Sequence, residues 1–318
     1  MDQADIMRPM REGNLERRDV ALLHVLMRDS RATEQQICGI TGMPSGEVAK
    51  RTEAMVEAGV IRSFTTKPSL TSLGAISVLV YGKSRLSTLE EAKDRLISND
   101  RVAWAALSGA GRLYVALHLH DINEKDVQLR KVEGEAMLLR PTAAVRDLFG
   151  SQIGTHEYDQ LDWGVVRSLS KDSRKPVEDV ARDLGRTVEE VDGHLGRMMQ
   201  NGLLDFSIEF DPNQCANPMC LFHVETIDPY ALEDRVRMVM ERNAPALLFF
   251  NTYSNVRQLM TTMAIPQDFE DLRSIMRSLR GEGGFGYVEA NPILSSCLMD
   301  TWRDKMVMEK GGPARRKR

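Results

Sequence analysis

The feature that most constrains the fold is an internal repeat. A shift of 143 positions places Asp29-Ser30-Arg31 on Asp172-Ser173-Arg174 without a gap. The same register superposes further pairs of identical residues: Asp19 on Asp162, Gly42 on Gly185, Val48 on Val191, Met55 on Met198 and Gly59 on Gly202. A shared register of this length predicts a duplicated two-module unit, so the two halves are expected to fold alike.

The first half opens with a pattern of short helices. Apolar residues at Leu22, Leu23 and Leu26 predict the buried stripe of a first helix. Thr33 is placed to cap a second helix, with Gln36 as its capping-box partner. The chain therefore begins with a helical module.

Glycines divide the rest of this module. Gly42 is placed to end the second helix in a left-handed conformation. Ser45 is predicted to cap a third helix, which is predicted to end at Gly59, and residues 60–64 are typical of a strand. Two short helices around a glycine turn, followed by a strand, indicate a winged helix-turn-helix.

This module resembles the N-terminal module of the Lrp/AsnC (feast/famine) transcription regulators. The residues that carry the resemblance are Asp19, Asp29-Ser30-Arg31, Ile37, Gly42, Ser45, Arg51 and Gly59-Val60-Ile61. In that family a small βαββαβ effector domain follows the winged helix, and paired effector domains present two reading heads to one operator. The resemblance covers nearly the whole chain, and it implies a sequence-specific DNA-binding transcription regulator that responds to a small-molecule effector.

The predicted fold is therefore α+β, with two winged helix-turn-helix modules alternating with two ferredoxin-like βαββαβ modules. Winged helices are expected at 15–67 and 158–212, and effector domains are expected at 74–152 and 216–308. Residues 309–318 form a basic tail. Because one chain holds both effector domains, we expect them to pack against each other as a covalent pseudo-dimer.

The pattern also places the elements of the effector domains. In the first, strands are predicted at 75–81, 102–107, 113–118 and 142–149, with helices capped by Ser87 and Asn123. In the second, strands are predicted at 219–224, 246–250, 258–265 and 287–294, with helices at 230–242 and 268–280.

Composition narrows the class of protein. The 318 residues carry a net charge of -4, so any basic DNA footprint must be local. No apolar run approaches a membrane span and the N-terminus lacks a signal-peptide core, which predicts a soluble cytoplasmic protein without a membrane partner. The four cysteines lack paired metal-ligand spacing, which favours reduced thiols over zinc or a disulfide. We expect no metal and no cofactor.

The third helix is the predicted DNA reader of the first module. Ser45, Glu47 and Lys50 are expected to face outward, with Arg51 beside them. Lys50 and Arg51 suit phosphates or guanine, and Glu47 suits a cytosine amine. Arg31 is a candidate for a flanking phosphate contact. The alternative is that these arginines pair with local acids.

The corresponding helix of the second half differs in charge. Residues 187–200 offer Glu189, Glu190 and Asp192 to the groove, with Arg197 as the full positive charge. Carboxylates repel phosphates, so this module is expected to be a scaffold or a protein surface. If only the first head reads double-stranded DNA, a palindromic site needs two chains, which predicts a homodimer.

The resemblance also implies an effector site. The family places a Ser/Thr-Gly turn and a nearby acid between the central strands of the effector domain. Ser108-Gly109 matches the turn, but Arg112 stands where the acid is usual, which favours an anionic effector such as a carboxylate. Residues 252–257 of the second copy lack the glycine, so that site is expected to be altered. The alternative is that both turns are simple tight connections.

Two other functions stay open. Siroheme decarboxylases resemble the same tandem design, but their Trp-Pro-Tyr-Asn stretch is absent from this sequence. His118 and His120 alternate on one strand face, a pattern more typical of packing than of a catalytic site, and no nucleophile motif or metal cluster occurs. We therefore expect a protein that is not an enzyme. The remaining alternative is an adaptor that binds no DNA.

Overall fold

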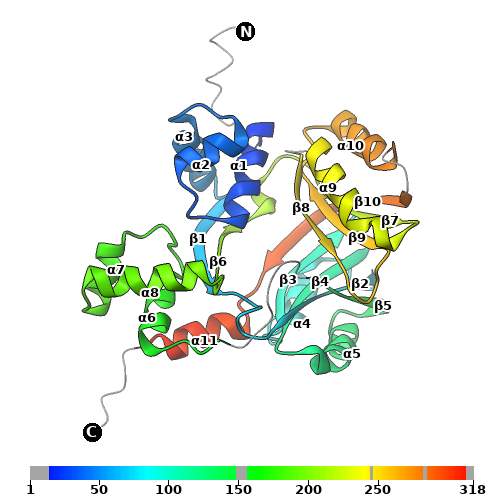
Figure 1. Cartoon of the computed structure of the whole chain (residues 1–318). Coiled ribbons are helices and arrows are strands. Elements are labelled where there is room, and N and C mark those ends of the chain that lie inside the picture. The colour runs from blue at the N-terminus through cyan, green and yellow to red at the C-terminus, as the bar shows by residue number, and fades with distance from the viewer. Residues whose placement is uncertain (1–13, 148–155, 244–245, 282–284, 313–318) are drawn as a thin grey trace.

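The computed structural model describes residues 14–147, 156–243, 246–281 and 285–312. Two three-helix bundles lie beside one large sheet (Figure 1). The elements of the first half are α1 (Arg17–Arg28), α2 (Glu34–Thr41), α3 (Glu47–Glu57), β1 (Ile61–Pro68), β2 (Ile76–Ser84), α4 (Leu89–Leu96), β3 (Val102–Ser108), β4 (Arg112–Leu119), α5 (Lys125–Glu135) and β5 (Leu138–Val145).

The same order of helices and strands recurs in the second half. Its elements are α6 (Gln160–Leu169), α7 (Val177–Leu184), α8 (Val188–Gln200), β6 (Leu204–Phe210), β7 (Met219–Thr226), α9 (Leu232–Asn243), β8 (Leu247–Thr252), β9 (Leu259–Ala264), α10 (Phe269–Gly281) and β10 (Phe285–Leu298). A last helix, α11 (Trp302–Lys310), follows and has no counterpart among the described residues of the first half.

Two of the predicted helix boundaries in the first bundle are confirmed and one is wrong. Thr33 and Gln36 form the capping box of α2, and Gly42 ends α2 with a φ of 69°. Ser45 does not cap α3: the N-cap is Gly46, with a φ of 81° that favours glycine. The Gly46 amide donates to the Glu34 carboxylate, so α2 supplies the group that fixes the start of α3.

Boundaries in the first effector region also shift. Thr88 caps α4 in place of Ser87, and Asp121 caps a short 3-10 turn that precedes α5 in place of Asn123. The closing strand β5 begins at Leu138, four residues before its predicted start. The prediction missed these residues because a bulge beside Arg140, which has a φ of 46°, interrupts the alternation of apolar residues. Its predicted last residues, 148 and 149, lie outside the described residues.

All strands except β1 and β6 form one eight-stranded sheet, in the order β5-β2-β4-β3-β10-β7-β9-β8. Its two halves join where β3 pairs with β10, from Ser108 beside Ile293 to Trp104 beside Leu298. At the opposite ends, Arg146 bridges to Tyr253. The sheet therefore bends round so that its ends meet, and the two regions predicted as effector domains pack against each other, as expected.

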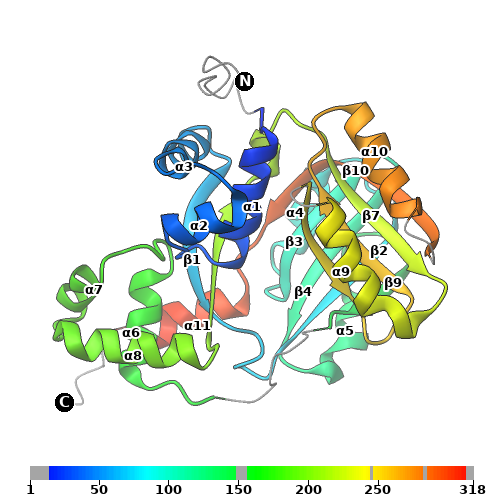
Figure 2. The same ribbon diagram turned by 45° about the horizontal axis from the view of Figure 1, so that its top comes forward.

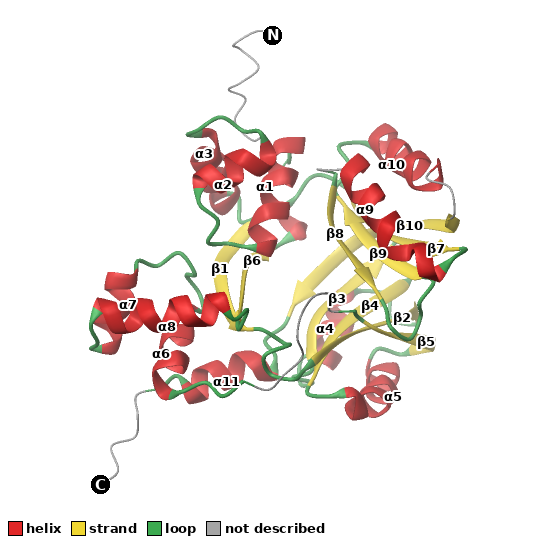
Figure 3. Cartoon of the chain, viewed as in Figure 1, coloured by secondary structure: helices red, strands yellow, loops and turns green. Residues whose placement is uncertain are grey.

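Helices cover the outer surface of this sheet (Figure 3). Alternation along each strand decides which side chains meet them. Leu113, Val115 and Leu117 of β4 belong to the apolar core formed with α4 and α5, whereas Tyr114 points to the inner face. The inner face of one half of the sheet thus contacts the inner face of the other.

The two helical bundles are joined by their strands. The strand β1 pairs antiparallel with β6, from Pro68 beside Leu204 to Ile61 beside Phe210. The first bundle also packs against β8, where a ring nitrogen of His24 lies 2.7 Å from the Leu248 carbonyl oxygen. The second bundle packs against α11 through α6 (Figure 2).

The helix α11 was not predicted, since residues up to 308 were assigned to the effector domain and the rest to a tail. A capping box between Thr301 and Asp304 begins it. The Trp302 indole donates to the His118 carbonyl oxygen at 2.8 Å, and Val307 joins the core of the second bundle. Residues 309 and 310 are therefore helical, and the remainder of the predicted tail from 313 lies outside the described part. Within that described part, no helix is long and apolar enough to cross a bilayer.

Candidate nucleic-acid interface

The outer face of α3 is the candidate surface for reading DNA. Ala49 and Lys50 are exposed on it, and Ser45 is exposed just before the helix begins, as predicted for Ser45 and Lys50. On the opposite face, Val48 and Met55 are buried in the core of the first bundle and hold the helix in place. A short exposed helix face with a lysine, fixed from behind, has the form of a recognition helix.

The other two predicted readers on α3 have internal partners. Arg51 donates to Glu47 at 2.6 Å, to Asp19 at 3.0 Å and to Glu16 at 2.9 Å. Glu47 also accepts from Arg18 at 2.9 Å. Burial alone would lower the pKa of Arg51, but these carboxylates raise it well above its usual value.

This network gives Arg51 and Glu47 partners within the protein, and their predicted contacts with DNA stay a prediction. The Asp19 carboxylate is fully buried, and Arg51 is its cationic partner. The arginine therefore ties α3 to α1, which is the alternative that the sequence left open. Helical periodicity could not find this contact, because Arg51 lies at the edge of the exposed face, where either solvent or α1 can be its neighbour.

The second bundle contains the same tie with different residues. Asp162, in register with Asp19, accepts from a ring nitrogen of His194 at 2.9 Å and from Arg197 at 2.5 Å. His194 occupies the position that corresponds to Arg51. Asp159, Asp162 and His194 could together hold a metal ion, but the Arg197 guanidinium already supplies the cation at Asp162.

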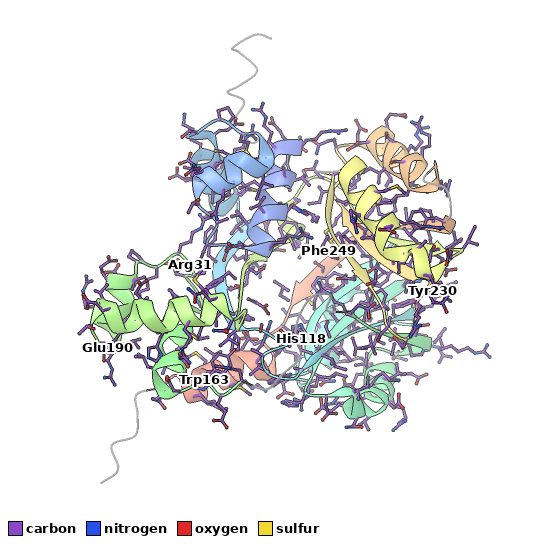
Figure 4. The ribbon with its side chains drawn as sticks, in the orientation of Figure 1. Arg31, His118, Trp163, Glu190, Tyr230 and Phe249 are labelled. Carbon is purple, nitrogen blue, oxygen red and sulfur yellow. The ribbon has the colours of Figure 1, made fainter. Side chains whose placement is uncertain are left out.

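The outer face of α8 stays acidic in the folded protein. Glu189, Glu190 and Asp192 are all exposed, and Figure 4 shows Glu190 at the outer edge of the second bundle. A phosphate backbone would meet three carboxylates there. This surface is poorly suited to DNA.

Arg31 lies at the junction between the two bundles rather than on an outer surface (Figure 4). It donates to the Ser173 carbonyl oxygen, and its counterpart Arg174 donates to the Ser30 carbonyl oxygen at 2.8 Å. The hydroxyl oxygens of Ser30 and Ser173 lie 2.7 Å apart and are buried. The repeated Asp-Ser-Arg segments therefore meet each other across a local two-fold relation, a contact that the sequence repeat did not reveal.

The predicted effector turn is part of the seam of the sheet. Ser108 is buried, and the Gly109 amide donates to the Pro292 carbonyl oxygen at 2.9 Å. Arg112 donates to Glu289 at 2.6 Å and to Asn291 at 3.1 Å. The second half therefore already supplies a carboxylate to Arg112, and binding of an external anion there stays a prediction.

The corresponding turn of the second half seals the other end of the sheet. The Asn255 side chain accepts from the Val145 amide at 2.7 Å and donates to the Ala143 carbonyl oxygen at 2.8 Å. The Tyr253 hydroxyl lies 2.6 Å from the Thr261 hydroxyl. Each turn thus contacts the last strand of the opposite half. This supports the alternative that both turns are simple tight connections.

A polar cluster that sequence reasoning missed lies between the inner faces of the sheet. The His223 ring lies 4.8 Å from the Tyr81 ring and 5.5 Å from the Tyr114 ring. Burial, with Arg112 nearby, lowers the pKa of His223 to about 4. Polar residues at alternate positions of β7 and β10 were the available signal, but a sequence does not say which strand faces meet.

His118, His120 and the cysteines pack within the fold. Burial beside Arg303 and Lys67 lowers the pKa of His118 well below its usual value, and the His120 ring lies 4.1 Å from the Trp302 ring. The cysteines are free thiols, and burial raises the pKa of Cys215 to about 12 and of Cys220 to about 11. Such thiols are poor nucleophiles.

Comparison with known proteins supports a DNA-binding bundle at the N-terminus. A winged helix-turn-helix DNA-binding family matches residues 15–62. The HTH-type transcriptional regulator PH0061 of Pyrococcus horikoshii is 27% identical over 105 residues, which cover 33% of this chain and 71% of that protein. The HTH-type transcriptional regulator PYRAB00690 of Pyrococcus abyssi is 28% identical over 120 residues, covering 38% and 78%.

Two solved structures of one protein are similar over nearly the full length. The siroheme decarboxylase NirDL superposes with a TM-score of 0.59 and covers 92% of this chain and 98% of its own. The sequence identity is 14%, so this likeness concerns the fold alone. It matches the arrangement of two helical bundles around one shared sheet.

Proposed function

We propose that this protein is a sequence-specific DNA-binding transcription regulator of the Lrp/AsnC type, which reads DNA with α3. The observation that carries the proposal is the exposed face of Ser45, Ala49 and Lys50 on a winged helix-turn-helix whose family binds DNA. The two archaeal relatives named as regulators support it. The network around Arg51 fits this role because it fixes the angle of α3 against α1.

We further propose that the two halves arose by tandem duplication and then diverged in charge. The recurring element order and the paired Asp-Ser-Arg segments support a common ancestor. Because the acidic face of α8 would repel DNA, the second bundle supports the first bundle instead of reading DNA itself. One chain then offers one reading head, so a palindromic operator takes a homodimer of chains. An effector at Ser108, Gly109 and Arg112 would have to displace Glu289 from Arg112.

Substitution of Lys50 tests the reading head. Lys50→Ala removes an exposed charge from α3 without disturbing the core, so DNA affinity should fall and the slope of log K against log salt should become shallower by about 0.9. Lys131→Ala is the matched control, because Lys131 is a half-exposed lysine on the distant helix α5. Fluorescence anisotropy with a selected duplex at several salt concentrations measures both quantities.

Equal affinities of the two variants would contradict the assignment of α3 as the reader. If the unsubstituted protein shows no salt-dependent binding to any duplex from a random pool, the protein is an adaptor instead. Selection from the random pool would also supply the operator sequence.

A second candidate function is a siroheme decarboxylase-like activity. It is favoured by the cluster of His223, Tyr81 and Tyr114 between the sheet faces, on a fold that resembles that of NirDL. Addition of an iron tetrapyrrole to the purified protein tests it by absorption spectroscopy. A saturable shift of the main tetrapyrrole band that His223→Ala abolishes would support this function over DNA reading alone.

A further inference from the structure

The junction of the two bundles carries two guanidinium groups whose hydrogen-bond donors are only partly used by its structural contacts. Arg31 and Arg174 each donate one hydrogen bond to a serine carbonyl oxygen of the other half. Among the described residues, neither guanidinium has a carboxylate oxygen within 4.0 Å, although Asp29 and Asp172 lie nearby. Each guanidinium therefore keeps donors for another acceptor.

Aromatic rings hold both guanidiniums in place. The Arg174 guanidinium lies 4.1 Å from the Phe64 ring centre, and the Arg31 guanidinium lies 5.8 Å from that of Phe206. A stacked arginine loses little further freedom when it binds a ligand. Burial lowers the pKa of both arginines, which indicates that neighbouring charges do not fully compensate them.

These arginines open onto a cavity of about 300 Å³ beside α3. Its walls come from α2, α3 and the junction, and they include Glu34, Ala49, Arg31 and Arg174. Glu34 is the single acid of the lining, and its carboxylate accepts from the Gly46 amide. Two cations against one engaged acid make the cavity attractive to an anion.

We propose that this cavity is a phosphate-binding site assembled from both halves of the chain, with Arg31 and Arg174 as its ligands. Planar guanidiniums donate paired hydrogen bonds to phosphoryl oxygens, and this chemistry distinguishes phosphate from a neutral ligand. The phosphate is either a backbone phosphate of DNA lying along α3 or the phosphoryl group of a soluble molecule. Only the first source rests on the proposed function.

Comparison of the two halves explains why the site belongs to the first one. Ala49 lines the cavity, and the residue in register with it in α8 is Asp192. An aspartate at position 49 would place a carboxylate beside the two guanidiniums. The second half carries that carboxylate, so it is suited to repel an anion.

The test uses the full chain and inorganic phosphate as the probe. Calorimetric titration at pH 7.5, with ionic strength held constant by sodium chloride, should show saturable binding. Arg174→Gln removes one ligand, and Ala49→Asp adds the repelling charge without removing any contact, so each should weaken binding by about tenfold. Arg182→Gln, at an exposed arginine of α7 paired with Asp179, is the charge-matched control and should bind as the unsubstituted protein does.

A second arm identifies the source of the phosphate. If a DNA backbone occupies the site, Arg174→Gln should lower affinity for a random duplex more than Arg182→Gln does, and inorganic phosphate should compete. Saturable phosphate binding with unchanged DNA affinity assigns the site to a soluble ligand, whatever becomes of the proposed reading head at Lys50. If phosphate does not saturate and the two arginine variants bind DNA equally, the proposal is wrong.

Discussion

At the scale of single residues, the molecule depends on buried charges that are paired across helices. The Asp19 carboxylate has no exposed surface, and Arg51 neutralises it from α3. Removal of one partner from such a pair leaves an uncompensated charge in the core. Arg51→Ala should therefore lower the free energy of unfolding by about 3 kcal/mol or more.

Urea denaturation followed by circular dichroism measures this loss. Arg18→Ala is the control, because Arg18 contacts the same Glu47 but is 45% exposed, and exposed ion pairs contribute about 0–1 kcal/mol. A similar small loss in both variants would show that Asp19 does not need its partner.

A second prediction at this scale concerns pH. The pKa of His223 is about 4 in the folded protein, against 6.5 in the unfolded chain. The unfolded chain therefore takes up a proton as the pH falls below 6.5 while the folded state stays neutral. The stability linked to His223 is fully present above pH 6.5 and is lost as the pH falls towards 4, with a loss of about 2 kcal/mol between pH 7 and pH 5.

Urea denaturation at pH 7, 6 and 5 tests the prediction. His223→Gln should flatten the decline, because glutamine does not titrate, although the buried His118 will leave part of it. A decline that is the same with and without His223 would contradict the assignment.

Residue-level prediction from the sequence succeeded where a local rule decides the outcome. The capping box of Thr33 and Gln36 and the left-handed Gly42 follow from neighbouring residues, and the structure contains them. The partners of Arg31, Arg51 and Arg112 could not be assigned from the sequence, because each finds its partner on another element. Which acid an arginine meets depends on packing that a single sequence does not specify.

At the scale of elements, the repeat located most helices and strands but concealed α11. Its capping box of Thr301 and Asp304 was legible in the sequence, yet no counterpart in the repeat drew attention to it. Trp302→Ala should lower the free energy of unfolding by about 3–5 kcal/mol, since Trp302 is 6% exposed and fills the space between α11 and β4.

Thermal unfolding with a probe in each region tests the role of α11. Met308→Ala is the control on the same helix, because Met308 is 55% exposed. If α11 braces the second bundle through Val307, Trp302→Ala should also make the Trp163 fluorescence more sensitive to quencher. A loss no larger than that of Met308→Ala would show that α11 is dispensable.

At the scale of the whole molecule, the two bundles act as one body because the Asp-Ser-Arg segments meet at the junction. The hydroxyl oxygens of Ser30 and Ser173 lie 2.7 Å apart, although the residues are 143 positions apart in the chain. Cysteines at both positions should therefore form a disulfide under mild oxidation with little rearrangement. A cross-link that closes so long a loop should stabilise the fold by about 4–5 kcal/mol.

The same cross-link tests whether the two bundles must separate before the protein can bind DNA. If the second bundle braces the first, the oxidised double variant should bind DNA as tightly as its reduced form, because the bond joins two buried residues and leaves the exposed Lys50 unchanged. Peptide mapping establishes the disulfide, and anisotropy compares the two redox states, with Ser30→Cys alone as the control for oxidation of the native thiols. Loss of binding on oxidation, restored by reduction, would mean that DNA binding requires the junction to open, and the bracing role of the second bundle would have to be abandoned.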